Sequence, residues 1–451
     1  MHAAKSAPKD LLRQSGGPSF EMHERLRRLD TEIQVAMAGA GAMGRGLLHQ
    51  CLVTPAFRCV ALADIDLKSA VDCAEATGIS YEVVSDLGSL HDCIRKDRLA
   101  VCQDATLAAR AKSADVFIDA SNAIKDAARF CTVALDHGKH LVMMNAEADL
   151  AFGPYLMQRA AEEGVTYASC DGDQHGVIKH LVDDLRLWDF DLVMAGNIKG
   201  YLDRYANPTS IIPEADKRNL DYRMCTAYTD GTKLGVEMAL LANALNLRTP
   251  VPGMHGPRAD HVKEVPDLFD LEALWDEQGP VVDYILGAEP DGGVFAVGYC
   301  EDPYQQRMME YYKMGEGPFY IFYRPYHLCH VEAMEAIATA VLDDRSLLQP
   351  KYGHVADVYA YAKTDLEPGD RLDGIGGYAC YGLIENCSDQ NERPGIPMTL
   401  AHGARVTTQI KKDEKIPAAQ VQIDEERADV QLHEQSLETG HAQGREGLPL
   451  P

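Results

Sequence analysis

The chain has 451 residues, 46% of them hydrophobic, which is enough for two or three domains with full hydrophobic cores. Its formal net charge of −26 argues against nucleic acid or an anionic membrane as the main partner, although a local cluster of lysine and arginine can still hold a small anion. The 12 cysteines form no CxxC pair, no apolar run reaches the ~18 residues of a membrane span, and no secretory signal is present, so we expect a cytoplasmic protein with reduced thiols.

The N-terminal third predicts a parallel sheet. Residues 1–30 are polar and basic, and predict a solvated arm with a short amphipathic helix. Residues 33–38 and 57–63 predict buried strands, and residues 45–53 predict the helix between them. Further alternation of strands and helices, with strands at 114–120, 140–145 and 165–169, predicts a doubly wound Rossmann sheet over residues 31–170.

A glycine-rich turn connects the first strand to the first helix. It reads Gly39-Ala40-Gly41-Ala42-Met43-Gly44, a GxGxxG pattern in a strand–turn–helix context. The first glycine allows the tight turn, the second lets a pyrophosphate approach the backbone, and the third lets the helix pack on the strand. Asp64 follows the second strand, 20 residues after Gly44, where a carboxylate binds ribose hydroxyls. These features predict a dinucleotide site; the alternative is a glycine-rich turn without a ligand.

Other polar residues follow the predicted strands, at the edge where such sheets bind ligands. We expect Ser121, Asn122 and Asn145 to line the cofactor site and Glu147 to contact the substrate. Each of them could equally be an ordinary polar loop residue.

Three further regions follow in the chain. Residues 171–349 mix helical stretches (177–188, 232–245, 328–342) with strand-like runs (192–198, 293–299, 318–323), and predict an α+β domain for substrate binding and dimerisation. Residues 350–425 carry short runs broken by Gly and Pro, and predict a small β module. Residues 426–451 are polar and predict a disordered tail.

The α+β region holds the residues with the clearest acid–base potential. Asp230, Lys233 and Glu237 are spaced to share one face of a helix, where a lysine among carboxylates can exchange a proton with a carbonyl or alcohol. The alternative is a capped helix with a surface ion pair. Lys199 and Arg204 follow another strand in a polar segment suited to an anionic or polyhydroxylated substrate, or to structural ion pairs.

Three more residues are candidates for substrate contact: Asp173, Arg324 and His327. Asp173 lies in a loop in which Asp171, Asp173 and His175 superficially resemble metal ligands, but aspartates that alternate with glycine often form turns. We therefore predict cleft residues and no metal site. His327 precedes a helix and is also suited to cap it.

The order of these blocks over residues 31–425 resembles a known group of proteins. The nucleotide domain, the strand that ends at Asn145 and the Asp230/Lys233 helix resemble the homoserine dehydrogenase superfamily. The stretch EPGDRLDGIGGYACYGLIE resembles a SAF (β-clip) domain, and MGEGPFYIFYRPYHLCHVE resembles a block of the SAF-domain oxidoreductases in this superfamily. That subgroup includes a second type of 1-deoxy-D-xylulose 5-phosphate reductoisomerase, which uses NADPH.

The resemblance implies an NAD(P)(H)-dependent enzyme in which Lys233 and Asp230 match catalytic residues of the family, and a homodimer or higher homo-oligomer. From its own polar segment, Lys199 is a further catalytic candidate. Homoserine dehydrogenases carry a catalytic lysine after the asparagine that corresponds to Asn145, whereas here Ala146 and Glu147 follow it, so homoserine itself is disfavoured as the substrate. The carboxylate of Asp64 favours NAD over NADP, because it would repel a 2′-phosphate, and Lys68 could offset that repulsion.

The sequence thus predicts an oxidoreductase that moves hydride to or from a small polar carbonyl or alcohol, with or without a phosphate. Coupled isomerisation, as in the reductoisomerase-like enzymes, is one version of this hypothesis. The alternatives are a homoserine dehydrogenase-like enzyme for another substrate and a non-catalytic protein that senses dinucleotides.

Overall fold

The computed structural model describes residues 22–218, 220–275, 279–390 and 394–445. The chain divides into two compact units. Unit 1 comprises residues up to Gly172 together with Leu328–Gln349, and unit 2 comprises Asp173–His327 and the chain from Pro350 onward. No helix among the described residues is both long and apolar enough to cross a membrane.

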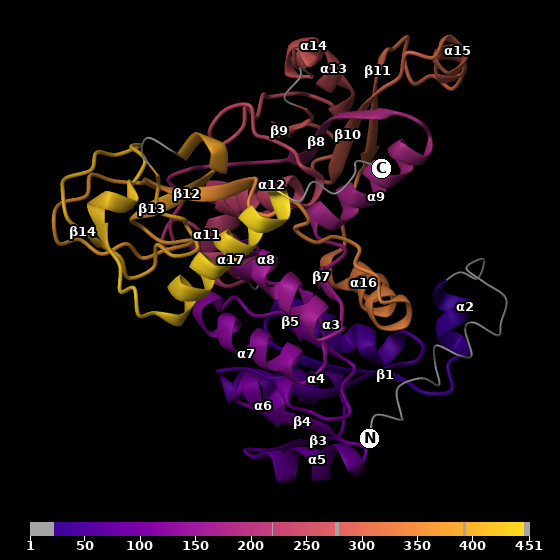
Figure 1. Ribbon diagram of the computed structural model, residues 1–451, viewed down its shortest axis with the longest axis vertical. Helices are drawn as coiled ribbons and strands as arrows, with labels where there is room; N and C mark the ends of the chain where they lie inside the picture. Colours follow the sequence, from indigo (N-terminus) through magenta and orange to yellow (C-terminus); the bar gives the residue numbers. More distant parts are fainter. Residues whose placement is uncertain (1–21, 219, 276–278, 391–393, 446–451) are drawn as a thin grey trace. The chain divides into compact units, whose positions relative to one another are not determined.

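Unit 1 is built on a seven-stranded sheet with the strand order β3-β4-β2-β1-β5-β6-β7 (Figure 1). Every strand pair in it is parallel. Its strands are β1 (Ile33–Ala38), β2 (Phe57–Ala63), β3 (Tyr81–Val83), β4 (Leu99–Cys102), β5 (Val116–Asp119), β6 (His140–Met143) and β7 (Tyr167–Ser169). The order reverses between β1 and β5, so this is a doubly wound sheet with its switch point at those two strands. The predicted fold class is confirmed.

Helices cover both faces of this sheet. In unit 1 they are α2 (Met22–Arg27), α3 (Ala42–Val53), α4 (Leu67–Thr77), α5 (Leu87–Arg95), α6 (Ala105–Ala109), α7 (Ile124–Asp136), α8 (Ala146–Glu162) and α16 (Cys329–Asp343). α3, α4 and α16 share one hydrophobic core with the strands, while α6, α7 and α8 pack against one another along the sheet. α16 therefore belongs to unit 1, although some 155 residues of unit 2 separate it from β7 in the chain.

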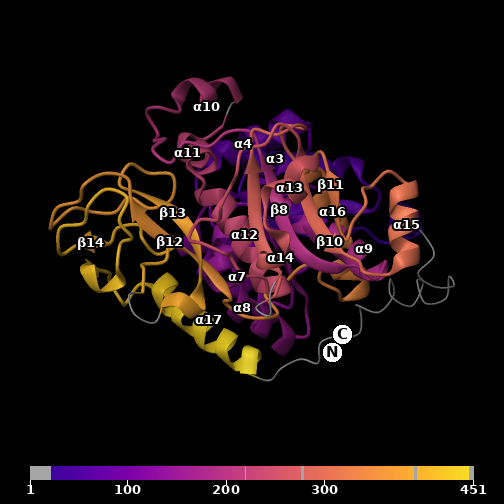
Figure 2. The same cartoon turned by 90° about the horizontal axis from the view of Figure 1, so that it is seen from above.

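Unit 2 contains a four-stranded sheet of order β11-β10-β8-β9. Its strands are β8 (Asp191–Lys199), β9 (Val281–Leu286), β10 (Val294–Tyr299) and β11 (Phe319–Arg324). The helices of this part are α9 (Gln174–Leu187), α10 (Ile212–Arg218), α11 (Tyr222–Asp230), α12 (Thr232–Leu245), α13 (Val265–Leu268), α14 (Leu271–Leu274) and α15 (Pro303–Tyr311). α12 is buried along its whole length, between this sheet and the hairpin of β12 (Ala356–Ala362) and β13 (Cys380–Asn386) (Figure 2).

The region after residue 350 is a small β module of short strands and isolated bridges, as the sequence predicts. It pairs β12 with β13 and β14 (Arg405–Val406) with β15 (Val421–Gln422). A buried ion pair fixes this module to the α11–α12 junction: the Lys363 ammonium lies 2.8 Å from a carboxylate oxygen of Asp230, and both side chains are at most 3% exposed. The same ammonium donates to the carbonyl oxygens of Ala206 and Gly377.

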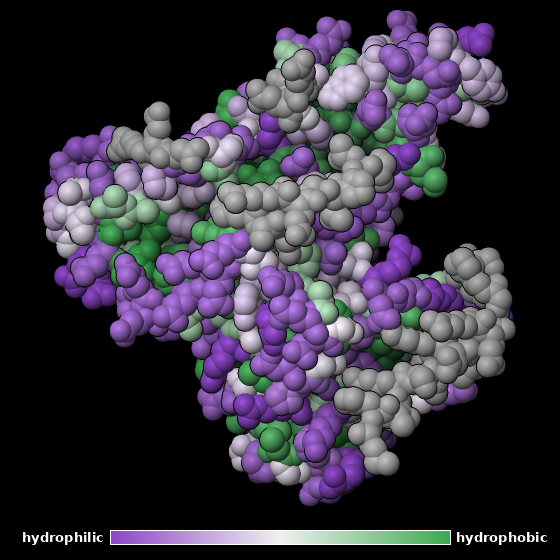
Figure 3. Space-filling model, in the orientation of Figure 1, coloured by the Kyte–Doolittle hydropathy of each residue, from purple (hydrophilic) through white to green (hydrophobic). Residues whose placement is uncertain are grey.

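One expectation for the C-terminal segment is wrong. The sequence predicts a disordered tail over residues 426–451, but residues Ala428–Arg445 form helix α17, and residues 446–451 lie outside the described residues. Its buried face carries polar and small residues: Ser436 bonds with His354, and the backbone of Gly440 packs directly against Gly353. Val430 is also buried there, beside the polar residues Asp429 and His433, and the exposed side of the helix is hydrophilic (Figure 3).

The ion pair gives a test of how unit 2 is held together. Replacing one member of a buried pair leaves the other charge uncompensated, so Lys363→Met should lower the free energy of unfolding by about 3–5 kcal/mol. The double variant Asp230→Asn/Lys363→Met should lose less stability than Lys363→Met, because it leaves no unpaired buried charge. Urea unfolding followed by tryptophan fluorescence measures this for unit 2, which holds both tryptophans, Trp188 and Trp275.

The matched control is Lys411→Met, which removes an ion pair with Asp365 whose side chains are both more than half exposed. It should change stability by at most about 1 kcal/mol. Equal losses for the two lysine variants would contradict a structural role for the buried pair.

Candidate functional site

The glycine-rich turn after β1 has three glycines with three different surroundings. Gly39 has a φ of +100°, and a Cβ there would lie 2.5 Å from the carbonyl oxygen of Ala120, beyond β5. A Cβ on Gly44 would lie 1.9 Å from the carbonyl oxygen of Gly39. Side chains are therefore excluded at both positions by the packing of the loop on α3 and β5.

Gly41 differs, because a Cβ there would meet no protein atom within 4 Å. Gly41 is the N-cap of α3, and no side chain caps the N–H groups of the helix there. Gly41 and Ala42 are exposed and Met43 is half-buried. Open space in front of uncapped helix N–H groups is what a pyrophosphate needs, so the loop fits a dinucleotide.

Asp64, at the end of β2, is anchored beside this loop. One of its carboxylate oxygens accepts from the backbone N–H of Ala40 at 2.7 Å, and the other accepts from that of Asp66 at 2.9 Å. The Lys68 ammonium lies 2.5 Å from Asp72, which raises the pKa of Lys68. Lys68 is therefore paired within its own helix and not with Asp64.

The strand ends of β5 and β6 carry a connected polar network. The Asn145 amide donates to Asp119 at 3.0 Å and to the carbonyl oxygen of Ala123, and its oxygen caps α8 through the N–H of Ala148. Ser121 donates to the other oxygen of Asp119 at 2.6 Å. Asn145 and Ser121 thus fix the shape of this edge through their side chains. Asn122 is exposed, and Glu147 is buried in the first turn of α8.

Asp119 itself is fully buried at this edge. Burial raises its pKa to about 7, against the opposing hydrogen bonds from Ser121 and Asn145. The network therefore changes its charge near neutral pH.

In unit 2, ionisable groups from three elements come together. Asp173 is the N-cap of α9, Lys199 ends β8, and Lys233 and Glu237 lie one turn apart on α12. Lys233 is 5% exposed and Glu237 is 2% exposed. We call these four residues the lysine cluster.

Charges in the lysine cluster act on one another. Burial lowers the pKa of Lys199, and the like charge of Lys233 lowers it further, while Glu237 and Asp173 oppose this; the net direction is downward. Burial raises the pKa of Asp173, but Lys233, His175 and His327 outweigh it and leave that pKa below its ordinary value. The arrangement thus keeps a carboxylate ionised beside a lysine that deprotonates more easily than usual.

Asp230 lies apart from Glu237 and Lys233. Gly231, with a φ of +89°, ends α11 and separates it from α12, so Asp230 does not continue the face shared by Lys233 and Glu237. The Asp230 carboxylate bonds to Lys363 and to the N–H of Thr232. Burial raises its pKa against the opposing charge of Lys363.

The remaining predicted residues are spread over unit 2. His327 is half-buried, with its Nε2 3.4 Å from the amide nitrogen of Gln174. Arg324 ends β11 with its guanidinium over the ring of Tyr326. The Arg204 guanidinium lies 5.8 Å from the ring centre of Tyr381 in the β module.

Asn197 was not among the predicted site residues. It is fully buried on β8, two positions before Lys199, and so lies on the same face of the strand. Its amide nitrogen and oxygen have no hydrogen-bond partner among the described residues. The two-residue spacing from Lys199 is the only sequence signal for it.

Comparison with known proteins places an enzyme domain on this part of the chain. Residues 172–333 match a family model described as the catalytic domain of oxidoreductase DRL. No curated protein matches the chain. The matched segment contains the whole lysine cluster, and the predicted class of enzyme, an oxidoreductase, is confirmed by this match.

Solved structures show a low similarity to this chain. A probable dehydrogenase from Thermotoga maritima has 9% identity and a TM-score of 0.41, covering 69% of this chain and 90% of its own. The 1-deoxy-D-xylulose 5-phosphate reductoisomerase from Zymomonas mobilis, in complex with NADPH, has 14% identity and a TM-score of 0.33, covering 71% and 84%. An oxidoreductase from Agrobacterium radiobacter, in complex with NAD+, L-tartaric acid and magnesium, has 11% identity and a TM-score of 0.29, covering 38% of this chain and 45% of its own.

The chain thus spans less than half of the Agrobacterium protein. At these identities and TM-scores the likeness carries no argument about substrate or mechanism.

Gly41 provides a test of dinucleotide binding. Gly41→Ala should fold with unchanged thermal stability, since nothing in the protein meets its Cβ, yet bind NAD(P)(H) at least about tenfold more weakly, since the methyl group enters the space of the pyrophosphate. Calorimetric titration with the four dinucleotides measures this. Gly292→Ala in unit 2, where a Cβ is equally free, is the control and should bind like the parent protein. Normal dinucleotide binding by Gly41→Ala would contradict the assignment.

Asp119 predicts a pH dependence of unit 1. Its pKa is 3.8 when unperturbed and about 7 in the fold, so the folded state holds a proton that the unfolded chain has lost. The contribution of Asp119 to stability is therefore fully present below about pH 4 and is lost as the pH rises to about 7, at roughly 1.4 kcal/mol per pH unit. Asp119→Asn should remove this dependence of the stability on pH. Hydrogen exchange of peptides from β5 between pH 5 and pH 8 measures it, and an unchanged slope would refute it.

Proposed function

We propose that this chain is an NAD(P)-dependent oxidoreductase that interconverts a small polar alcohol and its carbonyl compound. Unit 1 binds the dinucleotide on the turn from Gly39 to Gly44, with Asp64 beside it. Unit 2 supplies acid–base chemistry through the lysine cluster. The observation that carries the proposal is this cluster, because it lies within the segment that matches an oxidoreductase catalytic domain.

Oxidation of an alcohol to a carbonyl releases a proton from the hydroxyl, and the reverse reaction needs a proton at the same oxygen. The bound nicotinamide supplies or accepts the hydride. In our proposal Lys199 exchanges the proton, because its lowered pKa brings its neutral form closer to physiological pH. Lys233, to which the sequence assigned the proton, holds the pKa of Lys199 down and stabilises negative charge on the substrate oxygen.

Asn197 supports a polar substrate. A fully buried amide without a protein partner loses free energy unless something else bonds to it. Its position beside Lys199 suits a substrate hydroxyl or carbonyl oxygen. We therefore propose Asn197 and Lys199 as neighbouring contacts for a polyhydroxylated or otherwise polar small molecule.

The finer identity of the reaction stays a prediction. A SAF domain after residue 350, a homoserine dehydrogenase-like or reductoisomerase-like subtype, coupled isomerisation and a homo-oligomer rest on the resemblance of the sequence. Asp64 favours NAD. A protein that only senses dinucleotides would have no use for a proton-exchanging lysine, so the lysine variants separate this alternative from an enzyme.

The test begins with NAD(P)H oxidation across a panel of small polar carbonyl compounds that includes 1-deoxy-D-xylulose 5-phosphate. With the substrate found, Lys199→Met should lower kcat about 10²–10⁴-fold with dinucleotide binding intact. Lys233→Met should raise the pKa of Lys199, since it removes a like charge, and move the corresponding limb of the pH–rate profile to higher pH.

A second readout does not depend on the substrate. Reductive ¹³C-methylation with NMR titration should give Lys199 a pKa below the ordinary value of a lysine side chain, and Lys233→Met should bring that pKa closer to the ordinary value. Lys351 is an exposed lysine. Lys351→Met is the control for kinetics. Full kcat in Lys199→Met would exclude this lysine as the acid–base group.

A further inference from the structure

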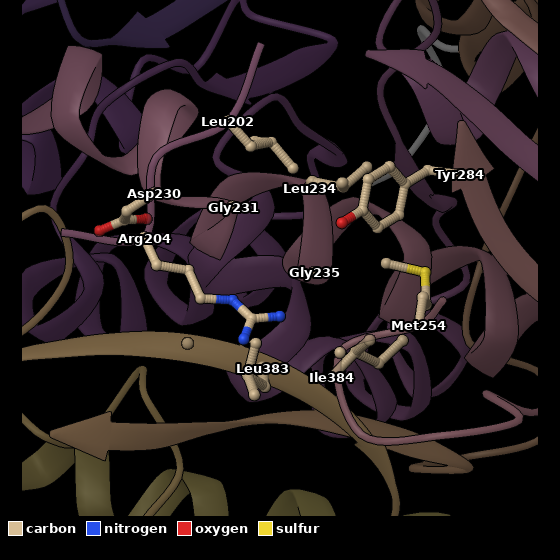
Figure 4. Close-up of a pocket in the computed structure, with 12 residues that line it drawn as sticks. Leu202, Arg204, Asp230, Gly231, Leu234, Gly235, Met254, Tyr284, Leu383 and Ile384 are labelled. Carbon is tan, nitrogen blue, oxygen red and sulfur yellow. The ribbon is translucent and has the colours of Figure 1, made fainter. Parts of the chain in front are cut away.

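A cavity of about 150 Å³ lies within unit 2, apart from the lysine cluster. It is enclosed by the loop before α10, the α11–α12 junction, β9 and β13, and none of the four cluster residues lines it. Five apolar residues line it, together with the polar residues Arg204, Asp230 and Tyr284; the apolar ones are Leu202, Leu234, Met254, Leu383 and Ile384 (Figure 4). The cavity therefore lies between the α+β part of unit 2 and its β module.

The Arg204 guanidinium points into this cavity, toward Leu383 (Figure 4). No carboxylate among the described residues forms an ion pair with it, and its one aromatic contact is the ring of Tyr381 at 5.8 Å. Asp230 also lines the cavity, but Lys363 neutralises its carboxylate at 2.8 Å. Arg204 is an exposed residue, so it brings a solvent-accessible positive charge to the wall of the cavity, in a chain whose net charge is −26.

The hydroxyl of Tyr284 points into the same space from β9, opposite Arg204 (Figure 4). Tyr284 is only 9% exposed. Burial raises the pKa of Tyr284, and the charge of Arg204 acts against this, so the two groups lie within electrostatic reach of each other. A guanidinium and a hydroxyl donor therefore converge beside these apolar side chains.

We propose that this cavity is a second small-molecule site, which binds a small organic anion with an apolar body. Arg204 forms a bidentate pair with its carboxylate or phosphate, Tyr284 donates a hydrogen bond to the same group, and the apolar body packs on the leucine, isoleucine and methionine side chains. The site depends on neither the dinucleotide nor the lysine cluster. Because Gly231 and Leu234 line it, the ligand contacts the turn that leads into Lys233.

The test compares three probes of similar length on the full chain: hexanoate, hexyl phosphate and the neutral 1-hexanol. Ligand-observed NMR or calorimetry should detect binding of at least one anion, and at least tenfold weaker binding of 1-hexanol. Arg204→Met should weaken binding of the anion at least tenfold and leave 1-hexanol unchanged. Tyr284→Phe, which removes only the hydroxyl, should weaken anion binding about threefold to tenfold.

Arg405→Met is the matched control, because Arg405 is an exposed arginine of the β module outside the cavity. It should bind the anions like the parent protein. Thermal melting of each variant separates loss of binding from loss of folding. A preference for hexanoate or for hexyl phosphate identifies the anionic group that the site takes.

Three results would overturn the proposal: no binding of either anion, unchanged binding in Arg204→Met, or an equal loss in Arg405→Met. Lys199→Met tests the location of the probe. Retained hexanoate binding supports a separate cavity, whereas its loss in a folded variant places the probe in the lysine cluster and refutes the second site.

Discussion

The Lys363 ammonium makes four separate parts of unit 2 depend on one another. From β12 and its flanking turn it reaches the Asp230 carboxylate at the end of α11, the carbonyl oxygen of Ala206 and that of Gly377. Asp230 in turn accepts the N–H of Thr232, the first residue of α12. The start of α12 is thereby fixed, and with it both Lys233 on one side and the wall of the Arg204 cavity on the other.

Burial of charge is acceptable here because the charges occur in compensating sets. The pair of Asp230 and Lys363 is closed, with every partner supplied by the protein, and such a pair has a structural role. The lysine cluster is different: its two lysines and two carboxylates shift one another's proton affinity, and Asn197 adds an amide without a protein partner. Ionisable groups that shift one another's pKa, beside an amide that the protein leaves without a partner, are typical of a site for a reacting molecule.

The sequence predicts most of the sheet of unit 1, since its strands are continuous apolar runs and its first turn requires glycine for steric reasons. β1 and β2 have the predicted limits, and α12 begins and ends where the hydropathy pattern indicates. Lys233 and Glu237 also follow from helical spacing. The proximity of Lys233 and Glu237 to Lys199 and Asp173 does not follow from the sequence, because it depends on how β8, α9 and α12 pack against one another.

What the sequence missed depends on contacts distant in the chain. Gly231, in the left-handed conformation, separates Asp230 from α12. The Asp230 carboxylate is bound by Lys363, which lies 133 residues later in the chain. α17 is stabilised by contacts with Gly353 and His354, far earlier in the chain, and its buried residues mix polar side chains with Val430. The assignment of α16 to unit 1 is likewise a long-range packing result, since its apolar face is equally compatible with either unit.

The placement of α16 has a consequence for the synthesis of the chain. Residues up to Gly172 leave the ribosome first and contain all seven strands of the sheet, but not α16. The core that includes Leu47 and Leu48 of α3 is completed only by Ala333, Met334 and Ile337, which follow after more than 150 further residues. At about 5–20 residues per second this interval lasts on the order of ten seconds or more, during which an apolar face of the nascent unit is uncovered. Unit 1 is thus the first to begin folding and cannot finish before most of unit 2 has been made.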